Sequence, residues 1–143
     1  HLRPTELENK TLQEGLQMIL KELTDKSNIR VVYKDMVKKV PKRIEDNLFR
    51  IAQEFISNTL KHAKASQIEV YLYQNSQEIQ LKMLDNGVGF DLNASTDEMS
   101  YGLKNIQERV DEMAGTVQFL TAKGKGTSID VRVPILRGED NVE

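Results

Sequence analysis

The stretch 85-DNGVGF-90 decides how this sequence is interpreted. Alternating apolar residues over 79–84 predict a strand that runs directly into it. Taken alone, Asn-Gly after a strand indicates a hairpin turn. Glycine, however, also lets a backbone approach a ligand closely, and a carboxylate at a strand end can accept a hydrogen bond from a buried amino group. The stretch therefore also fits a site that holds an adenine base.

Composition limits the alternatives. The chain has 143 residues, of which 38% are hydrophobic and 29% charged, as expected of one globular domain. A net charge of -2 without long runs of one sign argues against nucleic acid as the partner. The chain has no cysteine, which excludes disulfides, thiolate metal sites and cysteine nucleophiles. No apolar run approaches the ~20 residues of a membrane span.

Hydrophobic periodicity predicts three helices and five strands. The helices are expected over 11–25, 42–63 and 103–113, and the strands over 29–33, 67–73, 78–84, 116–120 and 128–133. Residues 91–101 are polar and patternless, which indicates a loop. Helices placed between hairpins predict an α/β fold, a two-layer sandwich in which a mixed sheet of about five strands is covered on one face by three helices. Residues 1–10 are expected to lead in from an upstream domain, 11–136 to form the domain, and 137–143 to be a polar tail.

The second helix carries polar residues that amphipathicity alone does not require. Asn47, Glu54, Asn58 and Lys61 fall within an arc of about 60°. An amide oxygen can ligate Mg²⁺ without repelling phosphates, a carboxylate one turn earlier can orient an attacking group, and a lysine can balance phosphate charge. The alternative is the solvated face of an amphipathic helix.

Two further stretches suit phosphate or base recognition. Gly102 and Leu103 stand at the expected start of the third helix, where backbone amides can bind an anion, or they only mark the helix start. In the loop 123-KGKGT-127, the hydroxyl of Thr127 can reach a base edge, although a flexible hairpin fits equally. Arg109, on the third helix, fits the role of a salt-bridge partner.

Together, these motifs resemble the ATP-binding domain of sensor histidine kinases, within the Bergerat-type superfamily that also holds Hsp90, gyrase B and MutL. The resemblance extends over nearly the whole chain. The N box is matched by Glu54, Asn58, Lys61, His62 and Ala63, the G1 box by Asp85, Gly87 and Gly89, the G2 region by Gly102 and Leu103, and the last glycine box by Gly124, Gly126 and Thr127.

Details of these boxes point to a subgroup. The KHA ending of the N box and the helix GLKNIQERV resemble kinases that pair with response regulators of the NarL type, in particular the cell-envelope stress kinases of Gram-positive bacteria. The chain departs from the wider family in three respects. It has no F box, Ser100 replaces the first G2 glycine, and the lid at 91–101 is short.

The resemblance implies a division of roles. Asp85 would bind the exocyclic amine of adenine, with Thr127 and the glycines Gly87, Gly89 and Gly126 completing the pocket. Asn58 would ligate the Mg²⁺ that bridges the phosphates of ATP. Lys61 and His62 would lie near the phosphates, and the amides of Gly102 and Leu103 would cap them. Glu54 would act as general base or orienting group for transfer to a histidine.

The resemblance also implies partners. The acceptor histidine of the family lies upstream, in a helical dimerisation domain. The two histidines here are His1, at the end of the sequence, and His62, in the N box. We therefore expect a mainly monomeric, cytoplasmic piece of a membrane-anchored, homodimeric sensor that phosphorylates a response regulator. The alternatives are an anti-sigma-factor-type serine kinase of the same superfamily, and an interaction module that binds nucleotide without catalysis.

Overall fold

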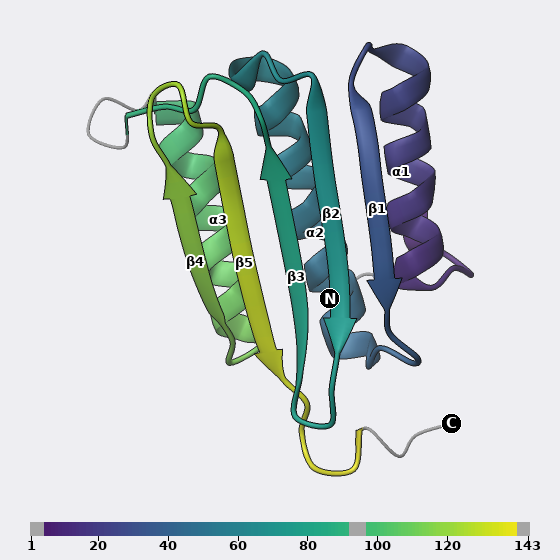
Figure 1. The fold of residues 1–143 in the computed structure, drawn as a ribbon. Helices are drawn as coiled ribbons and strands as arrows, with labels where there is room; N and C mark the ends of the chain where they lie inside the picture. The colour runs from purple at the N-terminus through teal and green to yellow at the C-terminus, as the bar shows by residue number, and fades with distance from the viewer. Residues whose placement is uncertain (1–4, 92–96, 140–143) are drawn as a thin grey trace.

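In the computed structural model, which describes residues 5–91 and 97–139, a five-stranded sheet is covered on one face by three helices (Figure 1). The helices are α1 (Leu12–Lys26), α2 (Lys42–Asn58) and α3 (Asp97–Glu112), and the strands are β1 (Arg30–Met36), β2 (Gln67–Gln74), β3 (Glu78–Asp85), β4 (Thr116–Thr121) and β5 (Thr127–Pro134). The strand order is β1-β2-β3-β5-β4. Only β1 and β2 pair in parallel, so the sheet is mixed. The predicted two-layer α/β sandwich is confirmed.

The core lies between the sheet and the helices. Burial alternates along β3 and along β2 as far as Tyr73, so that every second side chain there faces the helical layer. The helices contribute apolar stripes to the same layer. The fully buried residues include Leu16, Ile44, Leu48, Phe49, Ile51, Ile68, Val70, Leu72, Ile79, Leu81, Met83, Ile129, Val131 and Val133.

The first helix is fixed at its start by two carboxylates. The hydroxyl of Thr11 accepts from the amide of Glu14 at 3.1 Å, and the carboxylate of Glu14 accepts from the amide of Thr11 at 2.9 Å. This is the capping box that the sequence indicated. The buried carboxylate of Glu45 on α2 accepts from the amide of Leu12 at 2.7 Å. The second helix therefore also caps the first.

Several element boundaries differ from the predictions. The third helix begins at Asp97 rather than near 103, so the end of the expected loop is helical. The sequence offers a start signal there, with Thr96 followed by two acidic residues. The first strand extends to Met36, since its register with the second strand continues to the Met36–Tyr73 pair. The second helix ends as expected near Ala63, but its last turn, Thr59–Ala63 (η2), is π-helical.

Both ends of the domain contact its body. Leu7, within the short 3-10 turn Thr5–Leu7 (η1), is fully buried, and a Cβ built on Gly15 would lie 2.3 Å from its side chain. Part of the expected leading segment therefore belongs to the core. Among the described residues, no helix combines the length and the apolar character that crossing a bilayer requires.

Arg43, in the first turn of α2, fastens the other end. Its guanidinium donates to Glu139 at 2.8 and 3.0 Å, to the carbonyl of Pro134 at 2.6 Å and to the carbonyl of Met113 at 3.3 Å. The pKa of the Glu139 carboxyl is lowered, mainly because Arg43 donates hydrogen bonds to it. Burial raises this pKa, but the hydrogen bond from the Leu136 amide and the charge of Arg43 lower it further. The first residues of the expected tail are thus bound.

This ion pair predicts a pH-dependent stability. Because the pKa of Glu139 is lower in the folded protein, its contribution is present at neutral pH and is lost as the pH falls through the folded value. Glu139→Gln should lower the free energy of unfolding by about 1 kcal/mol near pH 7 and by almost nothing near pH 3. Urea unfolding followed by circular dichroism would measure this, with the exposed Glu108→Gln as the matched control. A difference that stays constant with pH would refute the assignment.

Candidate functional site

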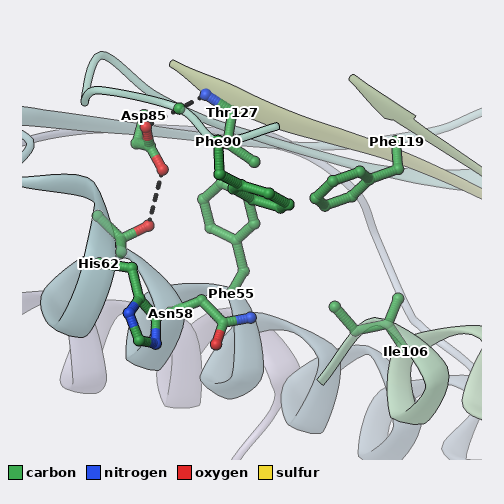
Figure 2. A pocket seen from close by; sticks show the side chains of 10 residues that line it. Phe55, Asn58, His62, Asp85, Phe90, Ile106, Phe119 and Thr127 are labelled. Carbon is green, nitrogen blue, oxygen red and sulfur yellow. Dashed lines mark hydrogen bonds between the residues drawn. The ribbon is translucent and has the colours of Figure 1, made fainter. Parts of the chain in front are cut away.

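A cavity between the sheet and the C-terminal part of α2 brings several of the predicted residues together (Figure 2). Asp85 and Thr127 reach it from the sheet, and Asn58 and His62 from the helical side. Its other walls are Phe55, Thr59, Gly89, Phe90, Ile106 and Phe119. The volume of the cavity is only about 20 Å³. In this conformation the cavity has room for about one water molecule.

Asp85 is the centre of the polar wall. Its carboxylate is 8% exposed and accepts hydrogen bonds at both oxygens. Oδ2 accepts from the hydroxyl of Thr59 at 3.0 Å, and Oδ1 accepts from the amides of Gly87 at 2.9 Å and Thr127 at 3.2 Å. A carboxylate offers about four acceptor positions. These three bonds leave one position, on Oδ2, for a donor that enters the cavity.

The asparagine after this strand does not form a hairpin turn. The side-chain oxygen of Asn86 accepts from the amides of Ser66 and Gln67, each at 2.9 Å, and its nitrogen donates to the hydroxyl of Ser66 at 2.8 Å. The third strand lies between β2 and β5, and its chain leaves the sheet after Asp85. Asn86 therefore ties the loop that follows Asp85 to the start of the second strand.

Two glycines allow the loops around Asp85 to interlock. Gly89 has φ +63°, and a Cβ there would lie 2.1 Å from the carbonyl oxygen of Ala122. Gly126 has φ +75°, and a Cβ there would lie 2.3 Å from the carbonyl oxygen of Asp85. The amide of Gly124 donates to the carbonyl of Val88. The two glycine motifs therefore form one packed unit.

Thr121 joins the same unit through its hydroxyl. It accepts from the amide of Phe90 at 3.1 Å, donates to the carbonyl of Gly126 at 3.2 Å and lies 3.0 Å from the hydroxyl of Thr127. With one proton and two lone pairs, Thr121 can satisfy all three contacts only if Thr127 donates to it. The lone pairs of Thr127 then remain as acceptors beside the cavity.

The helical wall carries Asn58 with Glu54 beside it. A Cβ on Gly102 would lie 3.0 Å from Oε2 of Glu54 and 3.1 Å from Nδ2 of Asn58. The absence of a side chain at Gly102 thus lets α3 pack directly over these two residues. Glu54 itself lines the neighbouring cleft between α2 and α3 rather than the cavity.

The predicted anion site at Gly102 and Leu103 is not formed. Both residues lie inside α3, as its sixth and seventh residues. Amides at interior positions donate to carbonyls one turn earlier and are not directed at a ligand. The start signal at 96–98 was missed because the glycine at 102 was taken as the helix boundary. Leu103 does not line the cavity either.

The π-helical turn separates two residues that the sequence grouped together. A turn closed by i→i+5 bonds winds less per residue than an α-helix. Counting from Asn58, this keeps His62 on the cavity side and turns Lys61 away from it, so that Lys61 lines a groove between α1 and α2 with Ile19 and Leu23. Lys61 is exposed there. The placement of Lys61 beside Asn58 is therefore wrong.

Sequence reasoning missed six residues of this site. Thr59 and Thr121 position Asp85 and the glycine loops, and the apolar walls come from Phe55, Phe90, Ile106 and Phe119. The rings of Phe90 and Phe119 are in contact, with centroids 5.7 Å apart (Figure 2). A signal was available for Thr59, which follows Asn58 directly, and for Phe90, which ends the stretch 85-DNGVGF-90. The others come from elements whose approach depends on the fold.

The arrangement has clear chemical capacities. A flat apolar molecule with one amino group would satisfy both the aromatic walls and the remaining acceptor of Asp85. The described residues hold no group of three or more side chains able to bind a metal ion. A cation near Asn58 would therefore take most of its ligands from the bound molecule or from water, as Mg²⁺ does with phosphates.

Known proteins are similar to this chain in sequence. The sequence pattern of the histidine kinase-, DNA gyrase B- and HSP90-like ATPases matches residues 43–137. The sensor protein VraS of Staphylococcus haemolyticus is 41% identical over 99% of the chain, and the sensor histidine kinase LiaS of Bacillus subtilis is 41% identical over 97%. The chain spans 40% and 38% of the lengths of these two relatives.

A solved structure has the same fold at lower identity. The histidine kinase domain from the Erythrobacter litoralis EL346 blue-light activated histidine kinase superposes with a TM-score of 0.70 at 17% identity. The similarity covers 92% of this chain and 64% of that one.

The close approach of the loops at Gly89 and Gly126 can be tested with two matched glycine substitutions. Gly89 and Gly124 both have positive φ, but a Cβ on Gly124 would meet nothing within 4 Å. Gly124→Ala should therefore cost about 1 kcal/mol of folding free energy through backbone strain alone. Gly89→Ala adds a clash with the backbone of Ala122 and should cost at least about 3 kcal/mol. Equal losses in urea unfolding would contradict the close approach of the two loops.

Proposed function

The chain belongs to the family of histidine kinase-, DNA gyrase B- and HSP90-like ATPases, and we propose that it is the ATP-binding catalytic domain of a two-component sensor histidine kinase. In this role it binds ATP with Mg²⁺ and donates the γ-phosphoryl group to a histidine of another domain. The observation that carries the proposal is the cavity that Asp85 and Asn58 share, within a chain of this family.

The sheet side of the cavity is suited to adenine. The remaining acceptor position of Asp85 takes the exocyclic amine, and Thr127 presents lone pairs beside it. Phe55, Phe90 and Ile106 supply the apolar surface on which a purine packs. Gly87, Gly89 and Gly126 keep the carboxylate and its loops in place.

The helical side is suited to the phosphates. Asn58 offers an uncharged oxygen ligand to Mg²⁺ that bridges the phosphates. His62 lies on the same wall and is near enough to serve as a phosphate contact. Glu54, beside Asn58 under Gly102, is the group that orients the attacking imidazole. Such transfer depends mainly on positioning and charge neutralisation.

Nucleotide binding requires the cavity to open. About 20 Å³ of accessible space does not admit a purine, and the ring of Phe90, which packs against the ring of Phe119, forms part of the wall (Figure 2). Phe90 is partly exposed and directly follows Gly89 in the loop after β3. We infer that displacement of the Phe90 ring admits the base.

The remaining partners follow from the relatives. VraS and LiaS are named as sensor proteins, and the chain corresponds to about two fifths of each. We propose that the chain works beside a dimerising domain with the acceptor histidine, on the cytoplasmic side of a membrane-anchored sensor, and that a response regulator of the NarL type receives the phosphate. Phosphate found on serine instead would favour the serine-kinase alternative.

The test of nucleotide binding is calorimetric titration of the chain with ADP and Mg²⁺. Asp85→Asn replaces an acceptor with a donor and should weaken binding at least about 100-fold. Thr59→Val removes one donor from the carboxylate at constant shape and should weaken binding about tenfold. The control is Thr116→Val, on the exposed end of β4. Absence of binding by the unmodified chain, or equal affinity for Asp85→Asn, would overturn the proposal.

A further inference from the structure

A second concave site, here called the outer site, lies on the face of the sheet that the helices do not cover (Figure 1). It is formed by the ends of β3, β4 and β5 that meet beside the turn joining β4 to β5, and its volume is about 400 Å³. Ligand pockets occupy roughly 300 to 1,000 Å³. The side chains that line the outer site are Leu84, Leu120, Ala122, Lys125 and Ser128.

The outer site and the cavity around Asp85 lie back to back across one layer of backbone. Successive side chains of a strand point to opposite faces of the sheet. On each of three adjacent strands, one residue lines the outer site and its neighbour belongs to the inner cavity or supports it. These pairs are Leu84 with Asp85 on β3, Ser128 with Thr127 on β5, and Leu120 with Thr121 on β4. A molecule in the outer site would therefore rest on the peptide groups that carry Asp85 and Thr127.

The lining of the outer site combines apolar surface with one positive charge. Leu120 is 57% exposed, and Leu84 lies half-buried beside it. Lys125 is exposed, and within the described ranges 5–91 and 97–139 it forms no ion pair. Asp130, further along the same face, already lies 3.4 Å from the guanidinium of Arg132. The charge and surface of this site therefore fit a molecule with an apolar body and one anionic group.

Hydrogen bonds connect the wall of the outer site to Phe90. The hydroxyl of Thr121 accepts from the amide of Phe90 at 3.1 Å and donates to the carbonyl of Gly126 at 3.2 Å. The amide of Gly124, in the same turn, donates to the carbonyl of Val88. The loop that carries Phe90 and the turn beside the outer site are therefore bonded at two points, and a shift of the Phe90 backbone would move the turn.

The two sites are suited to different conformations. In the conformation described, the outer site has about 400 Å³, whereas the inner cavity has only about 20 Å³ and must open before a purine can enter. A ligand shifts a conformational equilibrium toward the state to which it binds more tightly. A molecule in the outer site would thus favour the state in which the inner cavity is closed.

We propose that the outer site binds a small amphipathic anion, with its apolar body on Leu84 and Leu120 and its anionic group at Lys125, and that this molecule weakens nucleotide binding. The binding of the anion is independent of the proposed function, whereas its effect on the nucleotide rests on that function. The coupling is reciprocal, so nucleotide should weaken the binding of the anion by the same factor.

The binding site is tested with the fluorescent aromatic anion anilinonaphthalenesulfonate (ANS), titrated into the chain. Leu120→Asp should weaken ANS binding at least about tenfold. Lys125→Glu should weaken it about threefold or more, by a factor that falls as salt is added. The matched controls are Leu136→Asp, at a leucine 52% exposed outside the site, and Lys123→Glu, in the same turn but outside the lining. Unchanged ANS binding in both site variants, or equal losses in the controls, would overturn the outer site. If Leu120→Asp fails to fold, Leu120→Ala serves in its place.

The coupling is tested by titrating the chain with ADP and Mg²⁺ at increasing ANS concentrations. The dissociation constant of ADP should rise about fivefold or more and then reach a plateau, as coupling between separate sites requires. A rise without a plateau would show competition for one cavity, and an unchanged or lower constant would show no opposing coupling, so each of these results overturns the proposal. Without ANS, Leu120→Asp and Lys125→Glu should bind ADP as the unmodified chain does, and a loss there would assign these residues to the nucleotide instead. A chain that binds ANS at the outer site but no ADP refutes the proposed function and the coupling, and leaves the anion site standing.

Discussion

The hydrogen bonding of one buried carboxylate is the constraint on which this structure depends. Asp85 sits at the end of a central strand and is nearly removed from water. A charge in that position is stable only if donors replace the lost hydration. The donors come from Thr59 after the second helix, from Gly87 in the following loop and from Thr127 on the fifth strand. The loop at Asp85 and two segments distant from it in the sequence, at Thr59 and Thr127, are thereby brought together.

The same requirement explains the glycines and the cavity. The amide of Thr127 reaches Asp85 only because Gly126 lets the two backbones approach, and Gly89 allows the facing loop to close. These contacts satisfy Oδ1 and leave capacity on Oδ2, which has Thr59 as its one donor, in a cavity with aromatic walls. A polar group with one unused acceptor in an apolar wall makes binding specific, because only a ligand with a donor at that position gains a hydrogen bond.

Much of this could be predicted from the sequence. The two layers were predicted from the alternation of apolar residues along the strands and from the apolar stripes on the helices. Burial follows these two periods directly. Asp85 and Thr127 were proposed because each lies next to a glycine motif, and Asn58 because it belongs to a polar arc on the second helix. Lys61 was misplaced because 100° per residue does not hold in a π-helical turn. Thr121 and Phe119 were not found because their part in the site depends on how β4 lies against the loop after β3.

The geometry around Asp85 also bears on which base is accepted. A purine with an amino group at the position facing Oδ2 completes the hydrogen bonding of the carboxylate. A purine with a carbonyl oxygen there would place two acceptors against each other in a site with little water, and neither would find a donor. A rearranged side chain cannot relieve this conflict, because the Oδ1 bonds to the Gly87 and Thr127 amides fix the carboxylate. In the proposed binding mode, preference for adenine over guanine would therefore follow from the backbone amides of Gly87 and Thr127, which substitution of the surrounding side chains does not remove.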